Sequence, residues 1–282
     1  MADAIVGMYA FFAVLFGLVF GSFANVLIAR LPQDASLWTP SHCPRCGHRV
    51  RWYDLVPVLS WVWLRGRCRD CGTKISPTYP LVELLGGLLG YLLYVRFIDD
   101  IGDLVLPNVL AFVVFGAFLV ALVVAFFVDL RHQIIPEQTS TWLIPVGVLG
   151  TVALWVTGLD GFPAVSWEQS VLGALVGGAG LAAIAIAYRM LTGTDGMGFG
   201  DAKLLAMIGS FLGALPGVWI VMIFASFIGV AIHLVVILIR RRSGYVPFGP
   251  AMIVSTLIYF FYGDAVVPLI LPDLARITGI GG

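Results

Sequence analysis

Long apolar stretches follow one another along almost the whole chain, separated by short polar segments. Most of them approach the roughly 20 residues that an α-helix needs to cross the hydrocarbon core of a bilayer. The sixth stretch is short, and Pro216-Gly217 separates it from the seventh. The pattern predicts an all-α polytopic membrane protein with about eight transmembrane helices, at residues 5–29, 80–96, 108–128, 141–158, 169–190, 203–215, 217–239 and 250–271.

One segment interrupts this pattern. Residues 30–79 are rich in Arg, Cys, Trp and Pro. A domain of about 50 residues rarely has a core large enough to hold its fold unaided, so a staple is expected there. The sequence therefore divides into a first transmembrane helix at 1–29, a small insertion at 30–79 and a multi-helix membrane domain at 80–282.

The composition fits a membrane protein. Of the 282 residues, 60% are hydrophobic and 11% are charged, whereas soluble domains usually carry about 25% charged residues. The first 29 residues contain no Lys or Arg. They lack the positive n-region of a cleavable signal peptide, so we expect them to form the first span.

The basic residues predict the orientation. Lys and Arg accumulate in cytoplasmic loops, and with eight spans all but Arg96 and Arg276 fall on one side. We therefore expect the 30–79 segment to be cytoplasmic and both termini to lie outside. Because the basic residues follow the loops, no nucleic-acid partner is expected. The residues on the cytoplasmic side are Arg30, Arg45, Arg49, Arg51, Arg65, Arg67, Arg69, Lys74, Arg131, Arg189, Lys203, Arg240, Arg241 and Arg242.

All four cysteines lie in the insertion, in two C-x-x-C pairs that are 21 residues apart. Such pairs are typical of a tetrahedral thiolate site for zinc, although the gap is one residue longer than usual. A glycine follows each pair, where the turn needs a positive φ. We expect a structural zinc ion held by Cys43, Cys46, Cys68 and Cys71.

Two disulfides or unligated thiols are the alternative for these cysteines. A cytoplasmic position argues against disulfides. His42 and His48 lie beside the first pair and are substitute ligands, but four thiolates already complete the coordination shell.

Two aspartates lie at the cytoplasmic ends of predicted spans. Asp129 ends the third span and Asp201 precedes the sixth. Ionisable groups at the edge of hydrocarbon are costly and usually functional. Two close carboxylates share a proton, so one acts as a base on water while the other polarises a carbonyl group. Asp129 and Asp201 are therefore candidate catalytic residues of an aspartic peptidase. The alternative for Asp201 alone is a helix N-cap.

Further residues are candidates for a substrate or cofactor site. Gly198 and Gly200 allow close approach of an extended peptide, and Lys203 follows them. A nucleotide loop is disfavoured there because a helix, not a strand, precedes the glycines. Pro247 and Gly249 either line a substrate cleft beside the aspartates or merely start the eighth span. Glu83 begins the second span, where a helix N-terminus favours an anion. His132 lies three residues after Asp129, where it either tunes that acid or is a solvated loop residue. His233 lies within the seventh span, where it is expected to be an interhelical hydrogen-bond donor.

Several motifs in a fixed order closely resemble the prepilin peptidase family, the leader peptidases of type IV pilins and type II secretion pseudopilins. The resemblance covers nearly the whole chain. It rests on Gly21-Ser22-Phe23-Ala24-Asn25-Val26, both C-x-x-C pairs, Ile75-Ser76-Pro77, Tyr79-Pro80-Leu81-Val82-Glu83, Asp129-Leu130, Ile135-Pro136, Gly196-Met197-Gly198-Phe199-Gly200-Asp201-Ala202-Lys203 and Pro247-Phe248-Gly249-Pro250.

The resemblance implies an aspartic endopeptidase of the bacterial inner membrane. Such an enzyme removes a short basic leader from a prepilin or pseudopilin at the cytoplasmic face, with Asp129 and Asp201 as its acids. Members with the four cysteines also methylate the new N-terminal amine, and S-adenosylmethionine is their cofactor. No residue pattern in the chain demonstrates this second activity.

Two other functions compete with this interpretation. The first is a membrane transporter whose acids carry protons or cations, but such acids usually lie near the midplane of the membrane. The second is a peptidase whose cysteine domain binds a partner and takes no part in methylation.

Overall fold

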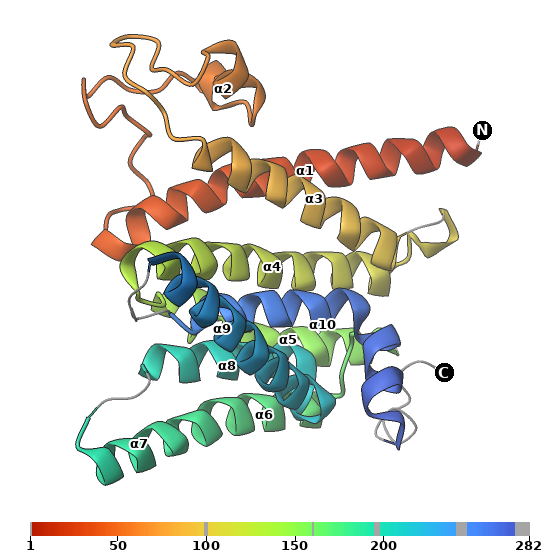
Figure 1. The fold of residues 1–282 in the computed structure, drawn as a ribbon. Coiled ribbons are helices and arrows are strands. Elements are labelled where there is room, and N and C mark those ends of the chain that lie inside the picture. Colours follow the sequence, from red (N-terminus) through yellow and green to blue (C-terminus); the bar gives the residue numbers. More distant parts are fainter. Residues whose placement is uncertain (1, 99–100, 160, 195–197, 241–246, 274–282) are drawn as a thin grey trace. The chain divides into compact units, whose positions relative to one another are not determined.

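The computed structural model describes residues 2–98, 101–159, 161–194, 198–240 and 247–273. These residues are mainly helical, and they contain two isolated β-bridges but no β-strand. The long helices are α1 (Ala2–Arg30), α3 (Thr78–Phe97), α4 (Leu106–His132), α5 (Leu143–Val156), α6 (Trp167–Leu175), α7 (Leu181–Thr192), α8 (Phe199–Leu212), α9 (Trp219–Arg240) and α10 (Gly249–Ile270) (Figure 1).

Shorter helical turns connect or extend these helices. α2 (Leu59–Trp63) lies in the cysteine-bearing segment between α1 and α3. The remaining turns are η1 (Leu31–Gln33), η2 (Trp52–Leu55), η3 (Ile101–Asp103), η4 (Glu137–Thr139), η5 (Val176–Gly180) and η6 (Gly213–Val218).

The chain forms two compact units, Met1–Val124 and Ala125–Gly282. In the first unit α1 packs against α3 through glycines. A Cβ on Gly17 or Gly86 would overlap the backbone of the other helix. Small residues let helix backbones approach closely inside a membrane, so these glycines hold the pair together.

In the second unit, α8 is the most deeply buried helix. Eleven of its 14 residues are buried, and α5 and α6 pack against it. Gly173 on α6 and Gly209 on α8 meet backbone to backbone. Ser170 Oγ donates a hydrogen bond of 2.6 Å to the carbonyl oxygen of Ser210. The apolar, glycine-bearing sequence of α8 permits this burial on all sides.

Seven segments of the described residues are long and apolar enough to cross a bilayer. One of them, Phe199–Leu238, has 40 residues and is interrupted at η6, where Leu215 has extended backbone (φ −122°, ψ 127°). The start of α8 and the segment after α9 line one cavity, so the chain reverses at η6. The sixth and seventh spans are thus separate helices, as Pro216-Gly217 predicted, and the all-α polytopic fold is confirmed.

Candidate active site and metal centre

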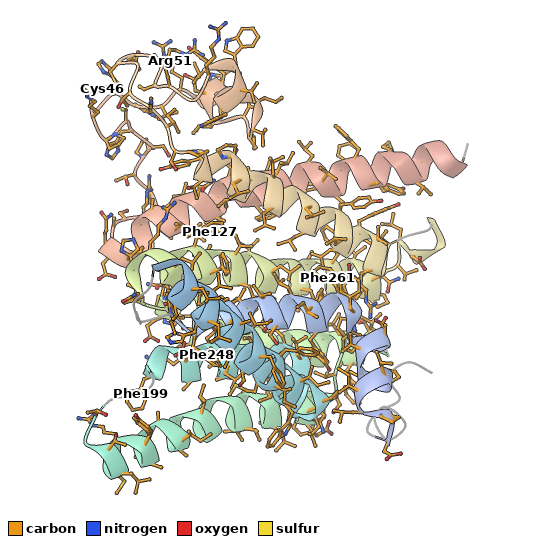
Figure 2. All side chains as sticks on the ribbon, viewed as in Figure 1. Cys46, Arg51, Phe127, Phe199, Phe248 and Phe261 are labelled. Atoms are coloured by element: carbon orange, nitrogen blue, oxygen red, sulfur yellow. The ribbon has the colours of Figure 1, made fainter. Side chains whose placement is uncertain are left out.

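Asp129 and Asp201 line the same cavity in the second unit. The cavity measures about 300 Å³ and is formed by the end of α4, η4, the start of α8 and the segment before α10. Asp129 is 5% exposed and Asp201 is 8% exposed. Figure 2 labels Phe199 in the first turn of α8 and Phe248 just before α10, on two of these segments. Residues 72 positions apart in sequence thus share one site.

The end of α4 positions Asp129. Asp129 lies in the last turn of the helix, and the Gln133 N–H donates a 2.9 Å hydrogen bond to its carbonyl oxygen. Gln133 has a left-handed backbone (φ 56°), which stops the helix there. Asp129 Oδ2 is buried and has no hydrogen-bond partner among the described residues. A buried carboxylate oxygen without a hydrogen-bond partner is costly.

Asp201 sits in the first turn of α8, where exposed N–H groups favour a negative charge. The N-cap residue of α8 is Gly198, and no side chain caps that end. Asp201 is therefore not the N-cap residue of α8 in the structure. Gly196 and Met197, which precede this turn in the motif, lie outside the described residues.

Glycines bring the backbone close to the acids. A Cβ on Gly249 would overlap Oδ2 of Asp129, and a Cβ on Gly200 would lie 3.4 Å from Ile135 Cβ. Ile135 Cδ1 would also lie 3.5 Å from a Cβ on Gly249. Ile135 therefore fills the space between the two glycine-bearing segments, and the side chain of Asp129 reaches the backbone at the start of α10.

An ion pair borders the cavity. Lys203 Nζ on α8 donates to Glu137 Oε1 on η4, and Thr141 Oγ1 donates to the other oxygen of Glu137 at 2.5 Å. Both partners of the pair are about half exposed. Their contact joins the segment after Asp129 to the helix that carries Asp201.

The structure brings most of the predicted site residues together. Gly198, Gly200, Lys203 and Pro247 line the cavity with the two aspartates, and Gly249 contacts Asp129. Glu83 does not line it. Its buried carboxylate lies in α3 of the first unit, where Oε2 accepts a 2.7 Å hydrogen bond from the N–H of Val58.

Several residues that line the cavity were not predicted from the sequence. Gln133, Ile134 and Glu137 follow Asp129 in a polar segment that sequence alone assigns to a loop. The only signal for Glu137 was its place beside the Ile135-Pro136 motif. Its pairing with Lys203, 66 residues away, depends on tertiary structure.

The four cysteines form a cluster that can bind a metal ion. Their Sγ atoms all lie within 4.8 Å of one another, and Cys43 Sγ lies 3.8 Å from Cys71 Sγ. Tetrahedral zinc with Zn–S bonds of about 2.3 Å needs sulfur separations of about 3.8 Å. The donor set therefore fits such an ion.

Both C-x-x-C pairs have the same local geometry. Gly47 N–H donates 2.9 Å to the Cys43 carbonyl, and Gly72 N–H donates 2.9 Å to the Cys68 carbonyl. The two glycines have φ of 72° and 68°, so the predicted positive φ is confirmed. Each turn presents its two sulfurs to the same point.

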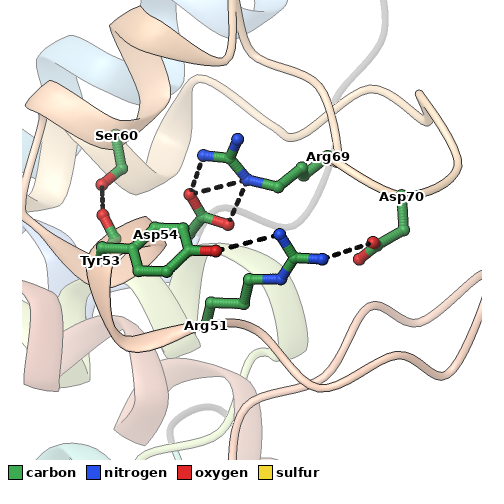
Figure 3. Close-up of polar contacts among 6 residues, drawn as sticks. All are labelled: Arg51, Tyr53, Asp54, Ser60, Arg69 and Asp70. Atoms are coloured by element: carbon green, nitrogen blue, oxygen red, sulfur yellow. Dashed lines mark hydrogen bonds and ion pairs between the residues drawn. The ribbon is translucent and has the colours of Figure 1, made fainter.

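Ion pairs tie the second cysteine pair to η2 (Figure 3). Arg69 donates three hydrogen bonds to Asp54, from Nη2 to Oδ1 at 2.5 Å and from Nε to Oδ2 at 2.9 Å and to Oδ1 at 3.2 Å. Arg51 contacts Asp70 at 3.5 Å and donates to Tyr53 Oη at 3.0 Å. The hydrogen bonds from Arg69 lower the pKa of the Asp54 carboxyl below its usual range. The charged network thus braces a domain that has little apolar core.

These features define a class: a polytopic membrane protein with a buried pair of acids at helix ends and a separate four-cysteine cluster. Two family models match the chain. The bacterial peptidase A24 N-terminal domain covers residues 15–97, and the type IV leader peptidase family covers residues 116–235. The first match contains the cysteine cluster, and the second contains both aspartates.

Bacterial proteins named prepilin leader peptidase/N-methyltransferase match over most of their length. The chain is 35% identical to the one from Aeromonas hydrophila, with 94% of this chain and 95% of the relative covered. It is 38% identical to the one from Dickeya chrysanthemi, with 86% and 88% covered. No solved structure matches the chain. The chain belongs to the type IV leader peptidase family and is a multi-pass membrane protein.

Proposed function

We propose that this enzyme is a membrane aspartic endopeptidase in which Asp129 and Asp201 cleave the leader from type IV prepilins or pseudopilins. The observation that carries the proposal is the pair of buried carboxylates that line one cavity at the ends of apolar helices. The names of the relatives support the substrate class.

The chemistry follows from the two carboxylates. One, ionised, takes a proton from a water molecule while the water oxygen attacks the scissile carbonyl carbon. The other, protonated, donates a hydrogen bond to the carbonyl oxygen. Breakage of the C–N bond then passes a proton to the leaving amine, giving a leader with a new carboxyl group and a mature chain with a new N-terminal amine.

The position of the acids suits a substrate that is itself a membrane helix. A leader that ends just before an apolar stretch has its scissile bond near the headgroup layer. Helix-end carboxylates next to a polar segment receive water at that level without a deep channel. The distribution of Lys and Arg supports a cytoplasmic location for this face and for the cysteine domain, with both termini outside. A C-terminal alkaline phosphatase fusion should therefore be active, and an inactive phosphatase beside a fluorescent C-terminal fusion would contradict this orientation.

Zinc is the proposed ion at the cysteine cluster, where Cys43, Cys46, Cys68 and Cys71 would hold it and its binding would stabilise the domain. Metal analysis of the purified protein should find zinc, and Cys43→Ser should remove it. Retention of the full zinc content by that variant would disprove the four-thiolate site.

The family and the relatives' names also support methylation of the new N-terminal amine, with S-adenosylmethionine as the methyl donor. The described residues contain no named strand, so they do not form the glycine-rich loop of a Rossmann-type site for that donor. We assign no residue to its binding.

Co-expression with a prepilin tests the proposal. Asp129→Asn and Asp201→Asn should each leave the prepilin unprocessed, whereas Asp34→Asn, a change at an exposed acid in the cysteine domain, should process it normally. Mass spectrometry of the mature pilin should find one added methyl group. Normal processing by either of the first two variants would overturn the assignment of the acids, and an unmethylated product would leave a peptidase alone.

A further inference from the structure

The cysteine domain carries an exposed apolar surface. None of the residues in η2 and α2 is buried. Trp52 is 80% exposed and Trp63 is 82% exposed, and Leu59 and Val62 between them are also exposed. We call these four side chains the α2 face. Large apolar side chains left exposed together in a small domain mark a contact with a membrane or a partner.

A partly buried hydrogen bond joins the start of α2 to a membrane helix. Val58, the residue before α2, donates its N–H to Glu83 Oε2 at 2.7 Å. Glu83 is the sixth residue of α3, a helix long and apolar enough to cross the bilayer. Figure 1 shows α2 next to the first turns of α3, within the same compact unit. The α2 face therefore lies at the level where α3 enters the membrane.

The local backbone indicates that this contact is maintained. Val58 has φ 61° and ψ −51°, the positive-φ conformation of a classic γ-turn closed by the Leu59 N–H and the Pro57 carbonyl at 2.6 Å, which is unfavourable for a β-branched residue. Such a residue persists where its surroundings hold it. The hydrogen bond to Glu83 supplies that restraint, so the position of α2 on α3 is specified.

Positive charges lie close in sequence to the α2 face. Arg65 and Arg67 follow α2 within four residues and are exposed. Arg51 and Arg69 instead form ion pairs with Asp70 and Asp54. Figure 2 labels Arg51 in this domain. Tryptophan at the headgroup level together with Arg is the pattern that binds anionic lipid at an interface.

We propose that the α2 face lies in the headgroup layer of the membrane that α1 and α3 cross, with Arg65 and Arg67 binding anionic phospholipid phosphates. The lipid covers the apolar side chains, and Glu83 positions the helix at this depth. This inference does not depend on the peptidase assignment.

Fluorine NMR on the full chain tests this proposal directly. The protein is labelled with 5-fluorotryptophan and placed in nanodiscs of phosphatidylglycerol or of phosphatidylcholine. Trp63→Phe and Trp52→Phe identify the two resonances. In phosphatidylglycerol, a headgroup-linked nitroxide lipid should broaden both strongly, and a soluble gadolinium chelate should broaden them weakly.

Charge variants then test the role of the arginines. Arg65→Gln with Arg67→Gln should reduce the ratio of lipid-borne to water-borne broadening by about fivefold per residue. The matched pair Arg45→Gln with Arg49→Gln, at the first cysteine pair, should leave it unchanged. Equal zinc content in both double variants confirms that the domain is folded.

Three outcomes would overturn the proposal. Strong broadening by the soluble agent in both lipids would place the α2 face in water. Equal lipid broadening in phosphatidylglycerol and phosphatidylcholine would remove the anionic requirement. Protection that arises only after a prepilin is added would assign the face to the substrate.

Discussion

Gly249 is the residue whose size most directly limits the acid pair. Its Cα lies against the carboxylate of Asp129, so that a methyl group there would overlap Oδ2. The Pro247-Phe248-Gly249-Pro250 motif thus has a physical role, because only glycine lets the start of α10 approach this acid.

We predict that Gly249→Ala reduces prepilin cleavage at least tenfold, because the new methyl group displaces Asp129 from its working position. The measurement is the initial rate of cleavage by the purified enzyme. Gly229→Ala is the matched control, since its nearest neighbour would lie 3.6 Å away, an ordinary contact. Equal rates for the two variants would show that the contact at Asp129 has no effect on catalysis.

The Asp54–Arg69 pair yields a prediction about pH. The pKa of Asp54 is lowered in the folded domain by hydrogen bonds from Arg69. Its contribution to stability is therefore complete above the ordinary pKa of about 3.9 and is lost as pH falls through the folded value. We expect Asp54→Asn to weaken zinc retention against a chelator, by the same factor at pH 6 and pH 8. A factor that changes between these values would contradict the assigned cause.

At the scale of helices, α6 and α8 are held together by a contact between glycines. A methyl group on Gly209 would overlap the carbonyl oxygen of Gly173. Since α8 carries Asp201 in its first turn, this packing also fixes the depth of one acid.

We predict that Gly209→Ala lowers the free energy of unfolding by about 1–3 kcal/mol, the usual cost of overpacking. Gly180→Ala, at a helical glycine with no neighbour within 4 Å, should be neutral or slightly stabilising because alanine favours helix. Thermal unfolding in detergent measures both. The idea fails if the two variants unfold at the same temperature.

Element boundaries were predicted unevenly. The lengths of the apolar stretches and Pro216-Gly217 were enough to predict α8 and α9 as two helices, because a proline followed by a glycine interrupts a helix. The π-helical turn at Val176–Gly180 was not predicted. At this turn Gly177 packs closely against the backbone of Leu205, a contact between segments far apart in sequence that the local sequence does not show.

At the scale of the whole chain, the sequence predicted the chemical groups of the sites better than their arrangement in space. The cysteine spacing predicted the cluster, and the apolar pattern placed Asp129 and Asp201 at helix ends. The cavity could not be predicted in full, because Glu137, Gln133 and Phe248 join it only through tertiary packing. Glu83 could not be placed from the sequence either. The sequence predicted it as a site candidate, but in the structure its Oε2 accepts a hydrogen bond from the N–H of Val58, just before α2.

We propose that Asp129 and Asp201 work as one catalytic pair. The decisive measurement is the cleavage rate of a purified prepilin by the wild type, by Asp129→Asn, by Asp201→Asn and by the double variant, each with verified folding. Residues that act as a unit are non-additive, so each single variant should lose as much activity as the double, at least about a thousandfold. A single variant with substantial activity, or losses that multiply, would contradict the pair.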